Sequence, residues 1–91
     1  MDSRVDTTVI TGGGQGIGRA IAIRMAEEGN VLVVGLDRGK LESVVRDLHS
    51  LGRNADFVRG DVADEDTAAR TLRTLEVNKW IVKNLVCNAG I

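Results

Sequence analysis

The chain has 91 residues, of which 43% are hydrophobic and 27% charged, and its net charge at pH 7 is −1. These values predict one small globular domain and give no electrostatic reason to expect nucleic acid or an anionic membrane as a partner. The single cysteine excludes an internal disulfide, no apolar run approaches membrane-spanning length, and the N-terminus has no signal-peptide core. We therefore expect a cytoplasmic protein.

A glycine-rich segment near the N-terminus organises the rest of the chain. Residues 7–11 are β-branched at every position, which is typical of a short buried strand, and five of the next seven residues are glycine. A helical pattern then runs from Gly16 to Gly29. A strand, a glycine loop and a helix in this order bring backbone N–H groups and a helix N-terminus against a phosphate. A flexible linker is the alternative, and the regular patterns on both sides disfavour it.

Two further helices and three further strands continue the alternation. Strands are predicted at 31–36, 55–59 and 84–88, and helices at about 40–51 and after the acidic residues 64–66. The first helix is expected to end at Gly29 and to turn Arg19 to water, and the second helix to end at Gly52. The predicted buried helix positions are Gly18, Ile21, Ala22, Met25, Leu41, Val44, Val45, Leu48, Ala68, Leu72 and Leu75.

Four strands separated by three helices indicate an α/β fold with a doubly wound parallel sheet. Right-handed crossovers would place the strands in the order 3-2-1-4, as in the first part of a Rossmann domain. The predicted βαβαβαβ unit is incomplete and occupies residues 1–91 as the N-terminal part of a single nucleotide-binding domain. The last strand would leave one edge of the sheet unpaired, which predicts self-association or pairing with a partner through that edge.

The spacing of the glycines identifies a particular kind of dinucleotide loop. The common pattern G-x-G-x-x-G is not met, because Ile17 stands where the third glycine would be. The pattern present, T-G-x-x-x-G-I-G from Thr11 to Gly18, resembles that of the short-chain dehydrogenase/reductase family. The resemblance covers essentially the whole chain, but only the first part of the family's fold. It implies NAD(P)-dependent oxidation or reduction of an alcohol/carbonyl pair when the protein is complete, with a dinucleotide and a small-molecule substrate as its partners.

The resemblance also implies a set of cofactor-binding residues along the carboxyl ends of the strands. Asp61 and Val62 resemble the family's adenine-side contact, although an aspartate before a helix is also common capping chemistry. Asn88, Ala89 and Gly90 resemble the N-A-G segment that closes the family's fourth strand. The full implied set is Gly12, Gly14, Gln15, Gly16, Ile17, Gly18, Asp37, Arg38, Asp61, Val62, Asn88, Ala89 and Gly90.

The choice between NAD and NADP depends on residues near the second strand. Asp37 ends that strand, where dinucleotide folds place an acid that accepts hydrogen bonds from the ribose and repels a 2′-phosphate. Gln15 is uncharged where family members that use NADP often carry a base. Arg38 points the other way, because a basic residue here can hold the phosphate. Together these residues favour NAD over NADP, and the alternative for Asp37 is a solvated turn residue.

Several residues are expected to have no catalytic role. Cys87 lies in an apolar strand and is interpreted as a small buried hydrophobe rather than a nucleophile. Asn84 stands where the family commonly has an aspartate, which leaves the usual local hydrogen bond open. His49 has no second histidine and no nearby cysteine, so no metal site is predicted. The resemblance to the family implies hydride transfer that is assisted by a tyrosine, a lysine four residues later and an upstream serine.

The chain contains no tyrosine, so no catalytic residue is assigned. We expect an NAD-binding N-terminal portion of an oxidoreductase that is inactive by itself. The alternative is a truncated, non-catalytic nucleotide-binding or interaction module. A reading frame that continues into a Tyr-x-x-x-Lys would separate the two.

Overall fold

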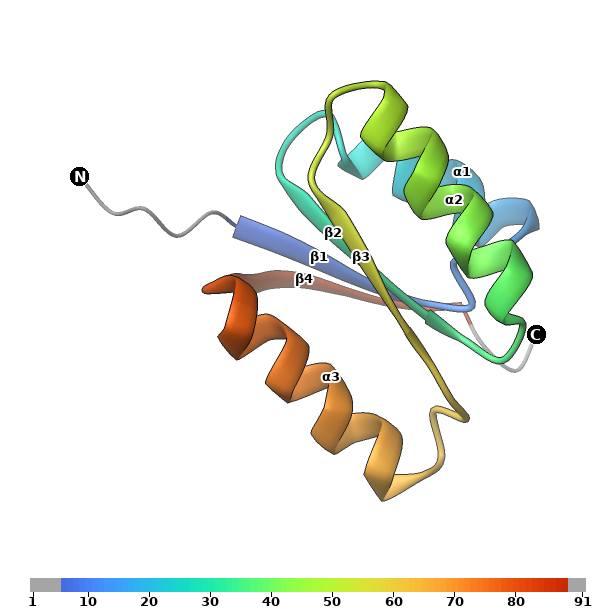
Figure 1. Ribbon diagram of the computed structural model, residues 1–91, viewed down its shortest axis with the longest axis vertical. Helices are drawn as coiled ribbons and strands as arrows, with labels where there is room; N and C mark the ends of the chain where they lie inside the picture. Colours follow the sequence, from blue (N-terminus) through green and yellow to red (C-terminus); the bar gives the residue numbers. More distant parts are fainter. Residues whose placement is uncertain (1–5, 89–91) are drawn as a thin grey trace.

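A computed structural model describes residues 6–88, which form one parallel sheet between two helical layers (Figure 1). The strands have the order β3-β2-β1-β4, and every neighbouring pair is parallel, as predicted. Helices α1 and α2 cover one face of the sheet and α3 covers the other. The elements are β1 (Asp6–Thr11), α1 (Gly16–Met25), β2 (Asn30–Gly35), α2 (Arg38–Ser50), β3 (Ala55–Arg59), α3 (Glu65–Asn78) and β4 (Ile81–Cys87).

Strand β2 is the centre of the core. Its four residues from Val31 to Val34 are at most 2% exposed. Val31 and Val33 pack with the side chains of α1 and α2, whereas Leu32 and Val34 belong to the cluster on the α3 side. Because successive side chains of a strand point to opposite faces, a strand covered on both faces needs an apolar residue at every position. The apolar run in the sequence is explained by this double coverage.

Helix α2 agrees with its predicted pattern. Its buried residues are the four predicted ones. It begins two residues earlier than predicted, because the Asp37 side chain caps it by accepting a hydrogen bond of 3.2 Å from the Lys40 backbone N–H. Gly52 has a φ of 77° and its N–H donates to the His49 carbonyl at 2.9 Å, so the predicted glycine terminator is confirmed.

Helix α1 differs from prediction at its end and on its polar side. It ends at Met25, so the prediction that Gly29 ends it is wrong. Beyond Met25 the backbone hydrogen bonds join residues three apart, as in a 3₁₀ turn. The Glu28 N–H, for example, donates to the Met25 carbonyl at 3.0 Å. Arg19 was expected to face water but is only 35% exposed, because its Nη2 pairs with the Asp47 carboxylate of α2 at 2.5 Å. This ion pair joins the two helices of one layer.

The orientation of α3 was predicted incorrectly in part. Leu75 is buried as expected, but Ala68 is exposed and Leu72 is 60% exposed, whereas Thr67 is buried. Leu75 packs with Trp80 and the apolar residues of β1, β2 and β3. The helix therefore presents the side that carries Thr67 and Leu75, which are two turns apart, and Leu72 falls outside the contact. The apolar periodicity of the sequence predicted the helix, but it did not predict which side of the helix faces the sheet.

Strand β4 is longer and more exposed than predicted. It begins at Ile81, three residues before the predicted start, and its pairing with β1 skips one residue between Val82 and Asn84. The prediction that Cys87 is buried is wrong: the residue is exposed, because β4 is an edge strand of the described sheet and pairs there only with β1. Leu85 is 63% exposed for the same reason.

Candidate functional site

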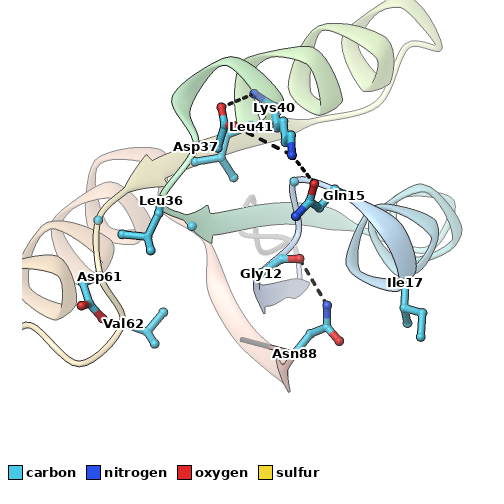
Figure 2. A pocket seen from close by; sticks show the side chains of 13 residues that line it. Gly12, Gln15, Ile17, Leu36, Asp37, Lys40, Leu41, Asp61, Val62 and Asn88 are labelled. Carbon is cyan, nitrogen blue, oxygen red and sulfur yellow. Dashed lines mark hydrogen bonds and ion pairs between the residues drawn. The ribbon is translucent and has the colours of Figure 1, made fainter. Parts of the chain in front are cut away.

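A cavity of about 660 Å³ lies at the carboxyl edge of the sheet, where the loops after β1, β2 and β3 meet the end of β4. Its size is in the usual range for small-molecule and cofactor pockets. In Figure 2, Asp37 and Lys40 lie at the top, Asp61 and Val62 at the lower left and Asn88 below, while Ile17 points away at the right. The lining residues are Gly12, Gly14, Gln15, Ile17, Gly35, Leu36, Asp37, Lys40, Leu41, Gly60, Asp61, Val62 and Asn88.

The glycine loop places a free helix N-terminus beside this cavity. Gln15 is the N-cap of α1, but its side chain makes no capping hydrogen bond, and the first turn of α1 has no acidic residue. The other two helices of residues 6–88 are capped by Asp37 and Asp64. The first-turn N–H groups of α1 are therefore free of a side-chain cap and form the kind of site that binds an anion.

Gly16 lies in the most open part of the loop. Its φ is 57°, a conformation that favours glycine, and a Cβ built on it would meet no protein atom within 4 Å. Its neighbours Gln15 and Ile17 both line the cavity. The loop thus leaves a space that a side chain would fill, which fits the approach of a pyrophosphate to the backbone.

Gly18 serves packing and does not line the cavity. A Cβ at this position would overlap the Gly12 carbonyl oxygen and lie 2.8 Å from the Gly12 carbonyl carbon and 2.9 Å from Asn88 Nδ2. Helix α1 therefore lies against the turn that leaves β1. This close approach holds the helix N-terminus at the edge of the cavity.

Asn88 joins the end of β4 to the glycine loop. Its backbone N–H donates to Thr11 Oγ1 at 3.1 Å, and its side-chain Nδ2 donates to the Gly12 carbonyl at 3.3 Å (Figure 2). Earlier in β4 itself, Asn84 Nδ2 donates to Thr8 Oγ1 at 3.3 Å, so this asparagine makes a local hydrogen bond to β1. The predicted positions Ala89 and Gly90 lie outside the described residues.

Asp37 lies in the cavity wall and has two contacts with α2. Its carboxylate caps α2, and its Oδ2 is 4.0 Å from the ammonium of Lys40. The same ammonium donates to Gln15 Oε1 in the glycine loop. Lys40 therefore links the glycine loop, which was predicted to hold the phosphate, to Asp37, which was predicted to contact the ribose; Figure 2 shows both contacts.

Arg38 does not line the main cavity. Its Nε donates to the Glu42 carboxylate at 2.7 Å, and its guanidinium carbon lies 5.8 Å from the centre of the Phe57 ring. The ion pair joins residues one helical turn apart in α2, and the cation–π contact is with a residue of β3. Together they direct the Arg38 side chain along α2 towards β3. The basic residue beside Asp37 therefore pairs with Glu42 and lines a separate, open hollow with Leu36, Asp37 and Arg59.

The loop after β3 forms the third wall. The Gly60 N–H donates to the Gly35 carbonyl at 2.8 Å and holds the loop against the end of β2. Asp61 Oδ1 accepts from the Ala63 N–H at 2.9 Å, whereas the cap of α3 is Asp64. The capping alternative for Asp61 therefore applies to a local turn and not to the helix. Val62 is 46% exposed in the cavity wall.

Most of the predicted site is brought together. Eight of the thirteen predicted cofactor-binding residues line the cavity. Gly16, Gly18 and Arg38 do not line it, and Ala89 and Gly90 lie outside the described residues. Sequence reasoning missed Gly35, Leu36, Lys40, Leu41 and Gly60 as lining residues. Lys40 had a usable signal, because it stands three residues after Asp37 at a helix start, where residues at that spacing are neighbours.

The remaining candidates form no site among the described residues. His49 Nε2 lies 2.9 Å from the Ala55 carbonyl oxygen, a contact that ties the end of α2 to β3. Within residues 6–88, no group of three or more histidine, cysteine or acidic side chains is placed to hold a metal ion. In the same range no helix is both long and apolar enough to cross a membrane.

A parallel sheet with this strand order and a glycine loop at its carboxyl edge defines a Rossmann-like nucleotide-binding α/β fold. The chain belongs to the short chain dehydrogenase family, whose model matches residues 6–91. A curated relative, the cis-4-hydroxycyclohexanecarboxylate dehydrogenase of Sinomonas cyclohexanicum, is 39% identical over 83 residues, which cover 91% of this chain and 33% of the relative.

Solved structures agree with this assignment. A 3-ketoacyl-ACP reductase from Sinorhizobium meliloti is similar with a TM-score of 0.86 and 35% identity, over 93% of this chain and 34% of that one. The L-sorbose reductase of Gluconobacter frateurii, complexed with NADPH and L-sorbose, has a TM-score of 0.85 and 29% identity, over 100% of this chain and 36% of that one. The chain thus spans about a third of the length of the relatives it matches.

Proposed function

We propose that these residues are the dinucleotide-binding portion of an NAD(P)-dependent oxidoreductase that acts on an alcohol/carbonyl pair. The observation that carries the proposal is the uncapped N-terminus of α1 beside a cavity of about 660 Å³ at the carboxyl edge of the sheet. The NADPH complex of the L-sorbose reductase supports it, because that protein has the same fold over this region. A bound dinucleotide would supply the hydride acceptor or donor.

The residues of the cavity divide into three proposed roles. The glycine loop from Gly12 to Ile17 and the start of α1 would hold the pyrophosphate. Asp37 would accept hydrogen bonds from the adenosine ribose, and Asp61 with Val62 would contact the adenine. Asn88 would brace the loop, through its hydrogen bond to the Gly12 carbonyl. The two positions after it are proposed to line the ribose on the strength of the family resemblance alone.

We propose that NAD is the preferred cofactor, and Asp37→Ala tests this. The variant is expected to weaken NAD binding by about 1–3 kcal/mol, because the ribose hydroxyls lose a charged acceptor, while NADP binding improves. Isothermal titration of both dinucleotides measures the change. Asp64→Ala is the matched control, since it removes the N-cap of α3 and leaves the cavity intact. A wild-type protein that already prefers NADP would contradict the assignment.

The 91 residues alone are expected to bind dinucleotide without turning over any alcohol or carbonyl. They contain no tyrosine, and a missing general acid/base removes about 10²–10⁴ in rate. The measurement is NAD-dependent absorbance change with a panel of alcohols and carbonyls, alongside a melting temperature that rises with NAD concentration. Robust turnover by a monomer of these residues would mean that another side chain transfers the proton.

The exposed edge strand β4 of the described sheet favours a second candidate function, an interaction module. Ile81, Val82 and Leu85 are each at least 39% exposed on this strand. An unpaired apolar edge strand is a ready template for another strand. The two candidates are separated by the reading frame after residue 91 and by the intact mass of the source protein: a longer protein with a Tyr-x-x-x-Lys supports the oxidoreductase.

A further inference from the structure

Lys40 is the one cationic side chain among the thirteen described residues that line the cavity. The two nearby arginines, Arg38 and Arg59, are not among these lining residues. Arg38 is paired with Glu42 at 2.7 Å, and Arg59 Nε donates to the Leu36 carbonyl at 3.3 Å. Positive charge inside the cavity therefore comes from Lys40, which the sequence did not single out.

The position of Lys40 is set by two contacts from different segments. Its ammonium lies 4.0 Å from Asp37 Oδ2 and donates to Gln15 Oε1. The side chain is 49% exposed, so its four-carbon stem reaches along the cavity wall while the charged end stays in contact with solvent. An ammonium on a flexible stem has three rotatable donors, so it can exchange Gln15 for another acceptor without moving α2.

We propose that Lys40 is the residue that sets how strongly this site discriminates against a 2′-phosphate. The inference rests on the proposed function, because it assumes that Asp37 faces the adenosine ribose. A carboxylate there repels the added phosphate, and an ammonium 4.0 Å from that carboxylate offsets the repulsion and gives the phosphate a charge-assisted donor. The site then prefers NAD but also accepts NADP, through Lys40 and not through Arg38.

The test compares two ligands that differ only in the 2′-phosphate, adenosine 2′,5′-bisphosphate and 5′-AMP. Isothermal titration is performed on the protein that carries this chain, without any need for turnover. Lys40→Gln is expected to weaken the bisphosphate about tenfold or more, and to change 5′-AMP by less than about twofold. Lys40→Arg, which keeps the charge, is expected to retain most of the bisphosphate affinity.

Two further variants make the assignment specific. Lys83→Gln removes a lysine of β4 that is paired with Asp6 at 3.3 Å and lies outside the cavity lining, so both ligands are expected to bind as in wild type. Arg38→Gln removes the arginine next to Asp37 and is expected to change the ratio of the two affinities by less than about threefold. Thermal melting confirms that each variant is folded, which the half-exposed position of Lys40 favours.

Four outcomes overturn the inference, and each has a different meaning. If only Arg38→Gln loses affinity for the bisphosphate, Arg38 and not Lys40 sets the discrimination against the 2′-phosphate. An equal loss of both ligands in Lys40→Gln would mean that Lys40 serves the phosphate they share. A folded wild-type protein that binds neither ligand would refute the proposed function, and the role of Lys40 with it, whereas 5′-AMP binding with an unchanged ratio in Lys40→Gln refutes only the role of Lys40.

Discussion

Gly16→Val is expected to abolish dinucleotide binding while leaving the protein folded. The wild-type glycine has a φ of 57°, and a Cβ there meets no protein atom within 4 Å, so the new side chain projects into open space beside the cavity. Filling that space would block the approach of a pyrophosphate to the loop and to the start of α1. We expect a loss of NAD affinity of at least about a hundredfold by isothermal titration, or about 2.7 kcal/mol.

Gly52→Val is the matched control for this prediction. Gly52 has a φ of 77° and also has nothing within 4 Å of a built Cβ, but it lies after α2 and outside the cavity lining. Both variants therefore carry a similar backbone strain, on the order of 1–2 kcal/mol, and only one meets the ligand. Unchanged NAD affinity in a folded Gly16→Val protein would refute the role of the loop.

Gly18→Ala is expected to lower the free energy of unfolding by about 3 kcal/mol, because the added methyl group overpacks a close contact between α1 and the glycine loop. The added Cβ would overlap the Gly12 carbonyl oxygen and lie 2.9 Å from Asn88 Nδ2. The first neighbour is backbone and cannot swing aside, and the second is a side-chain amide that is hydrogen-bonded to the Gly12 carbonyl. Helix α1 would have to move away from the loop, and small domains have only about 5–15 kcal/mol of stability in total.

Urea denaturation measures this change, and Gly39→Ala is its control. Gly39 is also a helical glycine, in the first turn of α2, but a Cβ there has its nearest neighbour at 3.5 Å, an ordinary contact. Alanine is favoured over glycine in helices by up to about 1 kcal/mol, so this control is expected to be neutral or more stable. A Gly18→Ala protein with wild-type stability would show that α1 does not depend on the close approach.

Local patterns were enough to predict the elements of the fold. The β-branched run before Gly12, the apolar run of β2 and the glycine after α2 each require one kind of backbone, and all three are found as predicted. The ends of the helices were harder to predict than their existence. The cap at Asp37 and the tight turn after Met25 depend on individual hydrogen bonds, which apolar periodicity does not report.

By itself, the sequence determined the order of strands and helices, the glycine loop and the aspartate at the end of β2. These features follow from backbone preference and from alternation of polar and apolar residues, both of which act over a few neighbouring positions. Only the tertiary structure decided which side chains meet across the sheet. It placed Lys40 against Gln15, paired Arg19 of α1 with Asp47 of α2, and left Leu72 exposed, because contacts between segments distant in sequence depend on how the helices are rotated and packed.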